Sequence, residues 1–453
     1  MILLKQPIPL SAKDYTYILL SFLTVCLFTN CTSYTNTTIT DSDSTSSLEV
    51  ENLQVNWSYT TAVYDDYIRS VILFQGEDQL APPYIPLEGL QLNCRFDDLN
   101  GGFNDYNFAI VHCDYHWEPS DMEYYEYVQG FNDNSITEME ESFGMKQMYT
   151  HYSFSFPNDM MRITRSGNYI LKVYPAGAED LPIFTHRFVV YENMIGYKVN
   201  VKPSTIISER RSKQEVDFEL EQISYPIYDA YADLDVAILQ NDRWDNAIFD
   251  LKPVFMKGTT FVYDFDEENN FNGLNEFRWF DSKSIRFTAL GTDSIRQVNN
   301  QWHLYLRPSA RRTYEVYRTD IDINGKRLLK NDDFDSFLES EYMFVHFYLP
   351  YDFKYPSSDI YVFGSLTNWN FQNRAKMSWN LEKKRYEGEL YLKQGYYNYM
   401  YSVVSPENPK GDMTAIEGNN IATENTYSIF TYYNDPQGYS RVIGLYITDS
   451  YNK

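Results

Sequence analysis

The chain has 453 residues, of which 43% are hydrophobic and 17% aromatic, so a mainly disordered protein is excluded and two to four domains are expected. Its 42 Tyr, 29 Phe and 7 Trp favour β-strands over helices, because flat rings cover a pleated sheet well. The formal net charge of -25 at pH 7 disfavours nucleic acid and anionic membrane surfaces as partners.

The segment 1–30 is typical of a signal peptide. Two lysines precede the apolar run Tyr15–Phe28, which is too short to span a bilayer. Cys31 follows this run where a bacterial lipobox has its cysteine, although Asn30 is bulkier than the small residue usual at that place. We expect a lipid on Cys31 that tethers the mature chain to a membrane; simple cleavage without a lipid is the alternative.

Short runs rich in Tyr, Val, Ile and Phe recur along the rest of the chain, separated by Gly, Pro, Asn and Asp. This pattern predicts strands joined by turns, and long segments with helical periodicity are scarce. We therefore expect an all-β protein with three consecutive immunoglobulin-like or early-set β-sandwich modules. The expected domains are a flexible Ser/Thr-rich tether at 31–54 and modules at 55–193, 194–335 and 336–453.

Two cysteines, Cys94 and Cys113, lie in strand-like segments of the first module. The segments Leu90–Phe96 and Tyr106–Cys113 are typical of a hairpin around the Asn- and Gly-rich turn between them. One cross-strand disulfide would form in an oxidising periplasm, and two small buried thiols are equally compatible with the sequence. Both alternatives stay open at this point.

The sequence contains no phosphate-binding glycine loop, no GxSxG elbow and no HExxH helix. His112 and His116 (HCDYHW) would lie about 13 Å apart on a strand, too far to share a metal ion without a sharp bend. The loop Asp97–Asp105 (DDLNGGFND) offers oxygens for calcium, but its residues are those that tight turns need and its spacing is not that of an EF-hand. We therefore predict a binding protein that has no enzymatic activity, no cofactor and no metal.

The last module resembles the glycogen-binding modules of branching enzymes and kinase β subunits. The resemblance rests on Ile360–Trp369 (IYVFGSLTNW), Met377–Trp379 and Tyr386–Met400. It implies a sugar-binding platform made by Trp369, Trp379 and Lys393. The alternative is that these two tryptophans pack against the sandwich and that the fold is kept without the ligand.

A second resemblance covers nearly the whole mature chain. The segments Ile68–Leu80 (IRSVILFQGEDQL), Phe96–Trp117 and Leu239–Ala247 (LQNDRWDNA) resemble the plug proteins of the type IX secretion system, a family of Bacteroidota. This resemblance implies a periplasmic protein at the outer membrane that binds the periplasmic mouth of the translocon barrel and closes it when no substrate is passing. A periplasmic carbohydrate-binding protein that uses the last module is the alternative function.

Docking to a barrel requires aromatic anchors on a rigid scaffold. Two Tyr- and Trp-rich loops of the first module offer them, and the candidate residues are Trp117, Tyr124, Tyr125 and Phe131. An ordinary surface loop is the alternative reading of both segments.

Overall fold

The computed structural model describes residues 57–224, 226–435 and 438–450. The predicted signal peptide, Cys31 and the whole tether at 31–54 lie outside the described residues. Strands account for 46% of the chain and helices for 5%, which confirms the prediction of an all-β protein. No helix in the described part of the chain is both long and apolar enough to cross a membrane.

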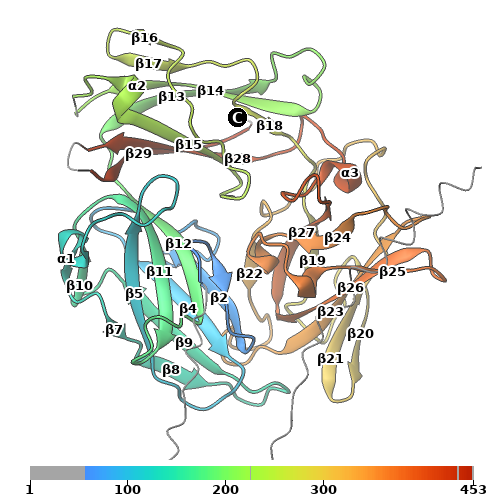
Figure 1. Ribbon diagram of the computed structural model, residues 1–453. Coiled ribbons are helices and arrows are strands. Elements are labelled where there is room, and N and C mark those ends of the chain that lie inside the picture. Colours follow the sequence, from blue (N-terminus) through green and yellow to red (C-terminus); the bar gives the residue numbers. More distant parts are fainter. Residues whose placement is uncertain (1–56, 225, 436–437, 451–453) are drawn as a thin grey trace, which may run out of the picture. The chain divides into compact units, whose positions relative to one another are not determined.

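The first sandwich is built from segments between residues 62 and 191, and its two sheets enclose an aromatic core (Figure 1). In that core the Phe96 ring stacks on Tyr152 at 4.9 Å and contacts Phe184 edge-on at 5.1 Å. One sheet has the order β1 (Ala62–Val63), β12 (Phe184–Tyr191), β11 (Gly167–Pro175), β5 (Tyr106–Cys113), β7 (Asn134–Ser135), with β3 (Tyr84–Pro86) parallel to β12; the other has the order β2 (Ile68–Gln75), β4 (Leu92–Asp98), β9 (Thr150–Phe156), β8 (Glu138–Glu141).

The middle sandwich combines segments from two distant parts of the chain. Val236 and Ile238 of one sheet pack against Phe218 and Phe261 of the other. One sheet holds β13 (Ile195–Pro203), β14 (Lys213–Gln222), β17 (Thr260–Tyr263), β16 (Phe255–Lys257) and β18 (Asn270–Asn272); the other has the order β15 (Leu234–Gln240), β28 (Thr426–Asn434), β29 (Ser440–Asp449).

The third sandwich lies in the sequence between β18 and β28 and is therefore an insertion in the middle one. Its core includes Phe280, Phe347 and Tyr399. One side holds β19 (Arg278–Asp281), β27 (Gly395–Val404), β22 (Arg327–Leu329) and β24 (Asp359–Phe363); the other has the order β20 (Thr292–Val298), β21 (Gln301–Leu306), β23 (Tyr342–Pro350), β26 (Arg385–Lys393), β25 (Ser378–Asn380).

This pairing corrects the predicted order of three consecutive modules. The predicted boundary between 194–335 and 336–453 falls inside the third sandwich, and β28 and β29, which follow it in the described chain, belong to the middle one. The reason is physical: hydrogen bonds between strands depend on neighbours in space, and alternation of side chains does not reveal which distant strand is the partner.

The short helices lie in connections between strands. They are α1 (Tyr124–Tyr127), α2 (Ala230–Asp233) and α3 (Thr414–Glu417), with two 3₁₀ turns, η1 (Ser365–Thr367) and η2 (Asn373–Ala375).

Buried contacts join the first sandwich to the other two. Tyr84, Ile170 and Val189 form one apolar cluster with Ala237 and Phe430 of the middle sandwich. Toward the third sandwich, the contact is ionic as well as apolar. Lys393 Nζ lies 2.7 Å from Asp97 Oδ2, and both side chains have no exposed surface.

Both cysteines are free thiols in buried positions, so the alternative without a disulfide is the one found. Cys94 lies on β4 and Cys113 on β5, which belong to different sheets and not to the expected hairpin. Burial raises the pKa of the Cys113 thiol to about 12, so the unreactive neutral form persists at neutral pH.

Candidate functional site

Four exposed apolar side chains lie in or next to α1 and β10 (Met161–Ile163), two elements of the first sandwich that lie side by side (Figure 1). Tyr124 and Tyr125 of α1 are 47% and 68% exposed, and their ring centroids lie 5.9 Å apart. Phe131 and Met160 are 63% and 54% exposed. We call these four residues the aromatic patch. Three of them were predicted from the sequence as partner-binding residues, and Met160 was not.

A two-stranded ribbon brings Phe131 and Met160 together. β6 (Val128–Gly130) follows α1 directly and pairs antiparallel with β10. The amide N–H of Phe131 donates to the carbonyl oxygen of Met160 at 2.8 Å. Gly130 is needed at this point because its φ is +108° and a Cβ would lie 2.2 Å from the Met160 oxygen. The ribbon thus presents both apolar side chains from one backbone contact.

The border of the aromatic patch is acidic. Glu123 and Glu126 form a capping box that holds the first turn of α1, and Asp121 precedes them. An open groove of about 640 Å³ adjoins the patch, and its lining includes Phe108, Phe131, Phe154, Met160, Glu138 and Asn158. Exposed rings, an adjoining groove with mostly polar walls and a charged border are typical of a protein-docking surface.

The sheet edge beside the patch is closed by a side chain. Asn132 faces the middle of β5, where its Oδ1 accepts from Ile110 N at 3.1 Å and its Nδ2 donates to Ile110 O at 3.0 Å. The amide group of Asn132 therefore replaces the neighbouring strand that an open edge would recruit. A strand from another molecule could not pair with β5 at Ile110 while this contact is in place.

The structure corrects the expectation that Trp117 is an exposed anchor. Trp117 is 3% exposed, packs edge-on against Trp244 at 4.7 Å and lies under the guanidinium of Arg187 at 4.4 Å. It belongs to the apolar cluster between the first and middle sandwiches. The sequence could not show this, because the second sheet that covers Trp117 comes from residues more than a hundred positions away.

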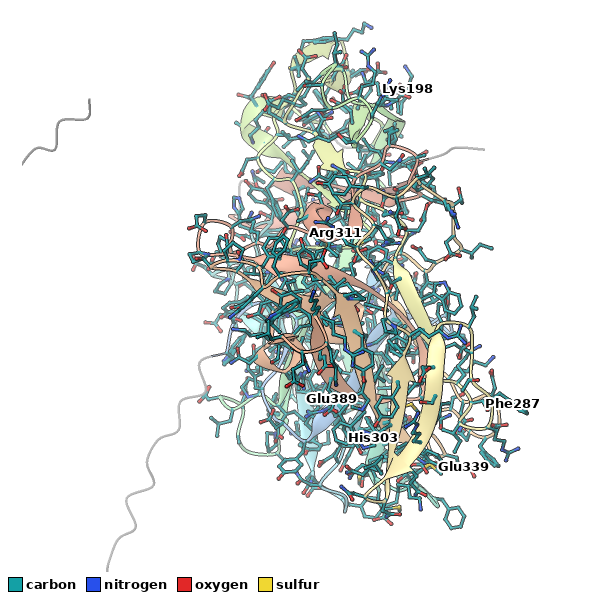
Figure 2. All side chains as sticks on the ribbon, turned by 90° about the vertical axis from the view of Figure 1, so that its right-hand side faces the viewer. Lys198, Phe287, His303, Arg311, Glu339 and Glu389 are labelled. Carbon is teal, nitrogen blue, oxygen red and sulfur yellow. The ribbon has the colours of Figure 1, made fainter. Side chains whose placement is uncertain are left out.

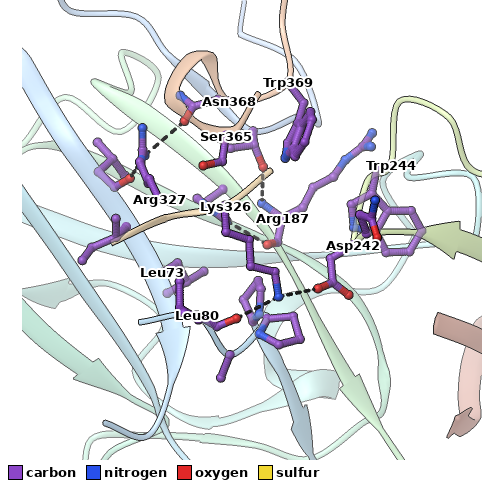
Figure 3. Close-up of a pocket in the computed structure, with 18 of the residues that line it drawn as sticks. Leu73, Leu80, Arg187, Asp242, Trp244, Lys326, Arg327, Ser365, Asn368 and Trp369 are labelled. Carbon is purple, nitrogen blue, oxygen red and sulfur yellow. Dashed lines mark hydrogen bonds and ion pairs between the residues drawn. The ribbon is translucent and has the colours of Figure 1, made fainter. Parts of the chain in front are cut away.

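A cavity of about 280 Å³ lies where the three sandwiches meet, and the sequence did not predict it (Figure 3). Lys326 Nζ lies 2.8 Å from Asp242 Oδ2 and donates to Leu80 O at 2.8 Å, so one ammonium group joins all three sandwiches. The walls are otherwise largely apolar and include Leu73, Pro82, Trp244 and Trp369.

Two arginines of this cavity are partly buried, and in the described residues neither has a carboxylate partner. Arg327 donates to Asn368 Oδ1 at 3.3 Å, and Arg187 donates to Tyr59 O at 2.9 Å. Burial lowers the pKa of Arg187 to about 10 and also lowers that of Arg327. Figure 3 shows the two side chains directed away from each other, so the cavity joins the sandwiches and does not focus charge on a single ligand.

The three residues predicted for a sugar platform are not exposed together. Lys393 is fully buried on Asp97, so the structure corrects its expected place on a sugar-binding surface. Trp369 lines the junction cavity with Arg243 at 4.7 Å over its ring, and Trp379 packs on Tyr386 at 5.1 Å. The alternative reading, in which both tryptophans pack against the fold, describes these contacts.

The two other segments considered for metals have structural partners. His112 is buried with Nδ1 2.9 Å from Ser120 Oγ, whereas His116 is an exposed ring beside Asp250. In the loop 97–105 the Asp98 carboxylate accepts from Asn104 Nδ2 at 2.7 Å and from the Tyr106 hydroxyl at 2.9 Å. These contacts are those of turns and of a core.

The first sandwich matches a known protein family. Residues 68–192 match the family described as the type 9 secretion system plug protein first domain. This part of the chain is a type 9 secretion plug domain. The resemblance seen in the sequence is thereby confirmed for the first domain, and the family is a secretion-system plug family and not an enzyme family.

Most of the chain is similar to a solved structure of a hypothetical protein from Parabacteroides merdae, with 31% identity and a TM-score of 0.83 over 87% of this chain and 100% of that one. The two chains belong to one family. An alpha-2-macroglobulin fragment from Escherichia coli is 9% identical over 44% of this chain and 89% of that one, but its TM-score of 0.17 is too low to indicate a shared fold. Curated proteins gave no match.

Proposed function

We propose that this plug-domain protein binds the periplasmic opening of the type IX translocon barrel in the outer membrane and closes it when no substrate is passing. A barrel that admits folded cargo would leak when idle, so the occluding protein must be rigid and removable. The observation that carries the proposal is the position of the aromatic patch within residues 68–192, the segment that matches the plug family.

The chemistry of the patch defines the partner surface. Buried aromatic anchors carry most of the energy of a protein interface, and a charged border adds orientation and speed of association. Tyr125 and Phe131 are the most exposed of the four patch residues. With Glu123 and Glu126 at the border and a chain charge of -25, we expect apolar pockets surrounded by basic groups on the barrel.

The double substitution Tyr125→Ser with Phe131→Ser tests the docking surface. Loss of two anchors is expected to reduce recovery of the protein with the barrel from detergent-solubilised outer membranes by at least about tenfold, because one anchor contributes about 2 kcal/mol or more. The matched control is Phe287→Ser, which removes a 76% exposed ring from the third sandwich (Figure 2). Recovery equal to that of the control would contradict docking through this patch.

The plugging role has a separate test. Deletion of the gene is expected to let a small dye enter through the outer membrane, and the Tyr125/Phe131 variant is expected to do the same. An intact permeability barrier after deletion would reject the role as a plug, whichever surface binds.

We also propose that Cys31 carries a lipid that keeps the protein at the periplasmic face of the outer membrane. Cys31→Ser is expected to move the protein from the membrane fraction to the soluble periplasmic fraction when the barrel is absent. Wild-type protein that is already soluble without the barrel would show that cleavage leaves no lipid.

A further inference from the structure

Three side chains that can bind metals lie next to one another on the outer face of one sheet of the third sandwich. His303 comes from β21, His346 from β23 and Glu389 from β26. The register places His346 opposite Glu389 in one pair of strands and opposite Tyr305 in the other. Figure 2 shows His303 and Glu389 on this sheet. The residues are 43 positions apart in the sequence at each step, so no motif reveals them.

The three side chains are in direct contact, and His346 uses its two ring nitrogens for different partners. His303 Nδ1 lies 2.9 Å from His346 Nε2, and His346 Nδ1 lies 3.2 Å from Glu389 Oε2. One ligand atom from each residue lies within 4.8 Å of the other two. A tetrahedral zinc ion with bonds of about 2.0–2.2 Å holds its ligand atoms roughly 3.3–3.6 Å apart, so small side-chain movements suffice.

Neighbouring rings fix the two imidazoles. Tyr305 stacks on His346 at 4.3 Å with nearly parallel planes, and Phe344 stacks on His303 at 5.0 Å. The His346 side chain is 16% exposed and that of Glu389 is 46% exposed. An ion held here would be shielded on the protein side and open on the other. The stacking reduces the entropy that the rings would lose on binding an ion.

The neighbouring cations are paired with another carboxylate, so they do not occupy the space between His303, His346 and Glu389. The neighbouring Glu387 is already bound by Arg385, 2.6 Å away, and by Lys383, 3.2 Å away. For Glu389, the contact within the described residues is that with His346.

We propose that His303, His346 and Glu389 bind one divalent transition-metal ion of the zinc class, with a fourth position open to water or to a side chain of another molecule. Two imidazoles and one carboxylate are a ligand set that zinc uses when one position stays open. The site lies outside the first domain, so the proposal does not depend on the docking surface.

A second cluster of the described residues shows what an occupied acidic site looks like in this chain. Glu215, Asp217 and Asp264 also gather within ligand distance. The ammonium group of Lys202 lies among them, 3.0 Å, 2.5 Å and 3.7 Å from their oxygens. A lysine therefore neutralises that cluster, whereas the described structure shows no such cation between His303, His346 and Glu389.

Calorimetric titration of Zn²⁺ into the untagged full chain, after treatment with a chelator, tests the proposal. We expect one ion per chain, with affinity at least about tenfold weaker in each of His303→Ala, His346→Ala and Glu389→Gln. Co²⁺ in the wild-type chain is expected to show the intense visible absorption of a tetrahedral site. Thermal unfolding of the apo variants reports whether each one folds, and Glu389→Gln keeps the test decisive if a histidine variant does not.

The control is His116→Ala, which removes an exposed imidazole that lies 3.2 Å from Asp250. It should leave the stoichiometry and affinity for Zn²⁺ unchanged. Absence of binding at a ratio of one to one, or a loss that is as large in His116→Ala as in the three site variants, would overturn the proposal.

Discussion

Replacement of Lys393 by methionine is expected to destabilise the folded chain by about 3–5 kcal/mol at pH 7, because it leaves the Asp97 carboxylate buried without its cation. Lys393 Nζ lies 2.7 Å from Asp97 Oδ2 and donates to Phe337 O at 2.7 Å. Asp97 keeps His151 and the Tyr342 hydroxyl, each at 2.6 Å, but loses the permanent charge. The shift in the urea midpoint of unfolding measures the effect.

The contribution of the Asp97 carboxylate to the free energy of unfolding decreases at low pH. Burial raises the pKa of Asp97, but Lys393 and His151 together outweigh it, so the net pKa lies below the ordinary value. The ionised form therefore stabilises the fold above the unfolded pKa of about 3.9, and this stabilisation is lost as the pH falls through the folded value. In Lys393→Met the carboxyl can accept a proton instead, so the difference from wild type should be smaller near pH 4.

An exposed ion pair provides the control for this substitution. Lys383→Met removes a lysine that is 55% exposed and lies 3.2 Å from Glu387, and its expected cost is below about 1 kcal/mol. Equal midpoints for Lys393→Met and Lys383→Met would contradict the buried contact. The double variant Asp97→Asn with Lys393→Met should recover part of the loss, because no charge is then left unpaired.

Glu417→Gln is expected to cost about 3 kcal/mol or more, because two arginines converge on this buried carboxylate. Arg278 Nε lies 3.0 Å from each of its oxygens, Arg312 Nη2 lies 2.6 Å from Oε2, and Tyr401 N donates to Oε1 at 2.9 Å. Arg312 belongs to the connection 307–326, which has no helix or strand of its own. Loss of this contact should release the connection as well as lower stability.

Limited proteolysis together with urea unfolding separates the two effects. The variant should be cleaved within 307–326 at protease concentrations that leave wild type intact. Burial raises the pKa of Glu417, but Arg278 and Arg312 lower it by more, so the folded pKa lies below the ordinary value. The stability that the ionised carboxylate contributes to wild type is therefore lost as the pH falls through this folded pKa. Glu315→Gln changes an exposed carboxylate of the same connection and should alter neither measurement. A variant that matches this control would refute the role of Glu417.

The sequence predicted most of what depends on local pattern. Alternating runs such as Met343–Leu349 are strands because every second side chain is buried, and turns such as 97–102 are held by Asp98 as their composition indicates. Tyr125 and Phe131 are exposed as predicted, since they lie in acidic, polar surroundings. These features are set within a few residues of one another.

Features that depend on distant pairing were not predictable from one sequence. Trp117 and Lys393 are covered by segments far away in the chain, and nothing in their own neighbourhoods distinguishes a buried ring or ammonium from an exposed one. The same holds for His303, His346 and Glu389, which three separate strands bring together. The place of β28 and β29 in the middle sandwich is a further example.

The place of β28 and β29 in the middle sandwich sets the order in which the three sandwiches can fold. The middle sandwich needs β28 and β29, which leave the ribosome or the export channel after the strands of the first and third sandwiches, before its second sheet exists. All strands of the first and third sandwiches come earlier in the chain, so these two can fold first. Until β28 and β29 emerge, the middle sandwich has only its first sheet, and β15 has no partner strand. A chain cut short before Thr426 should therefore lose the middle sandwich first, although the third sandwich lies between the missing residues and β13–β18 in the sequence.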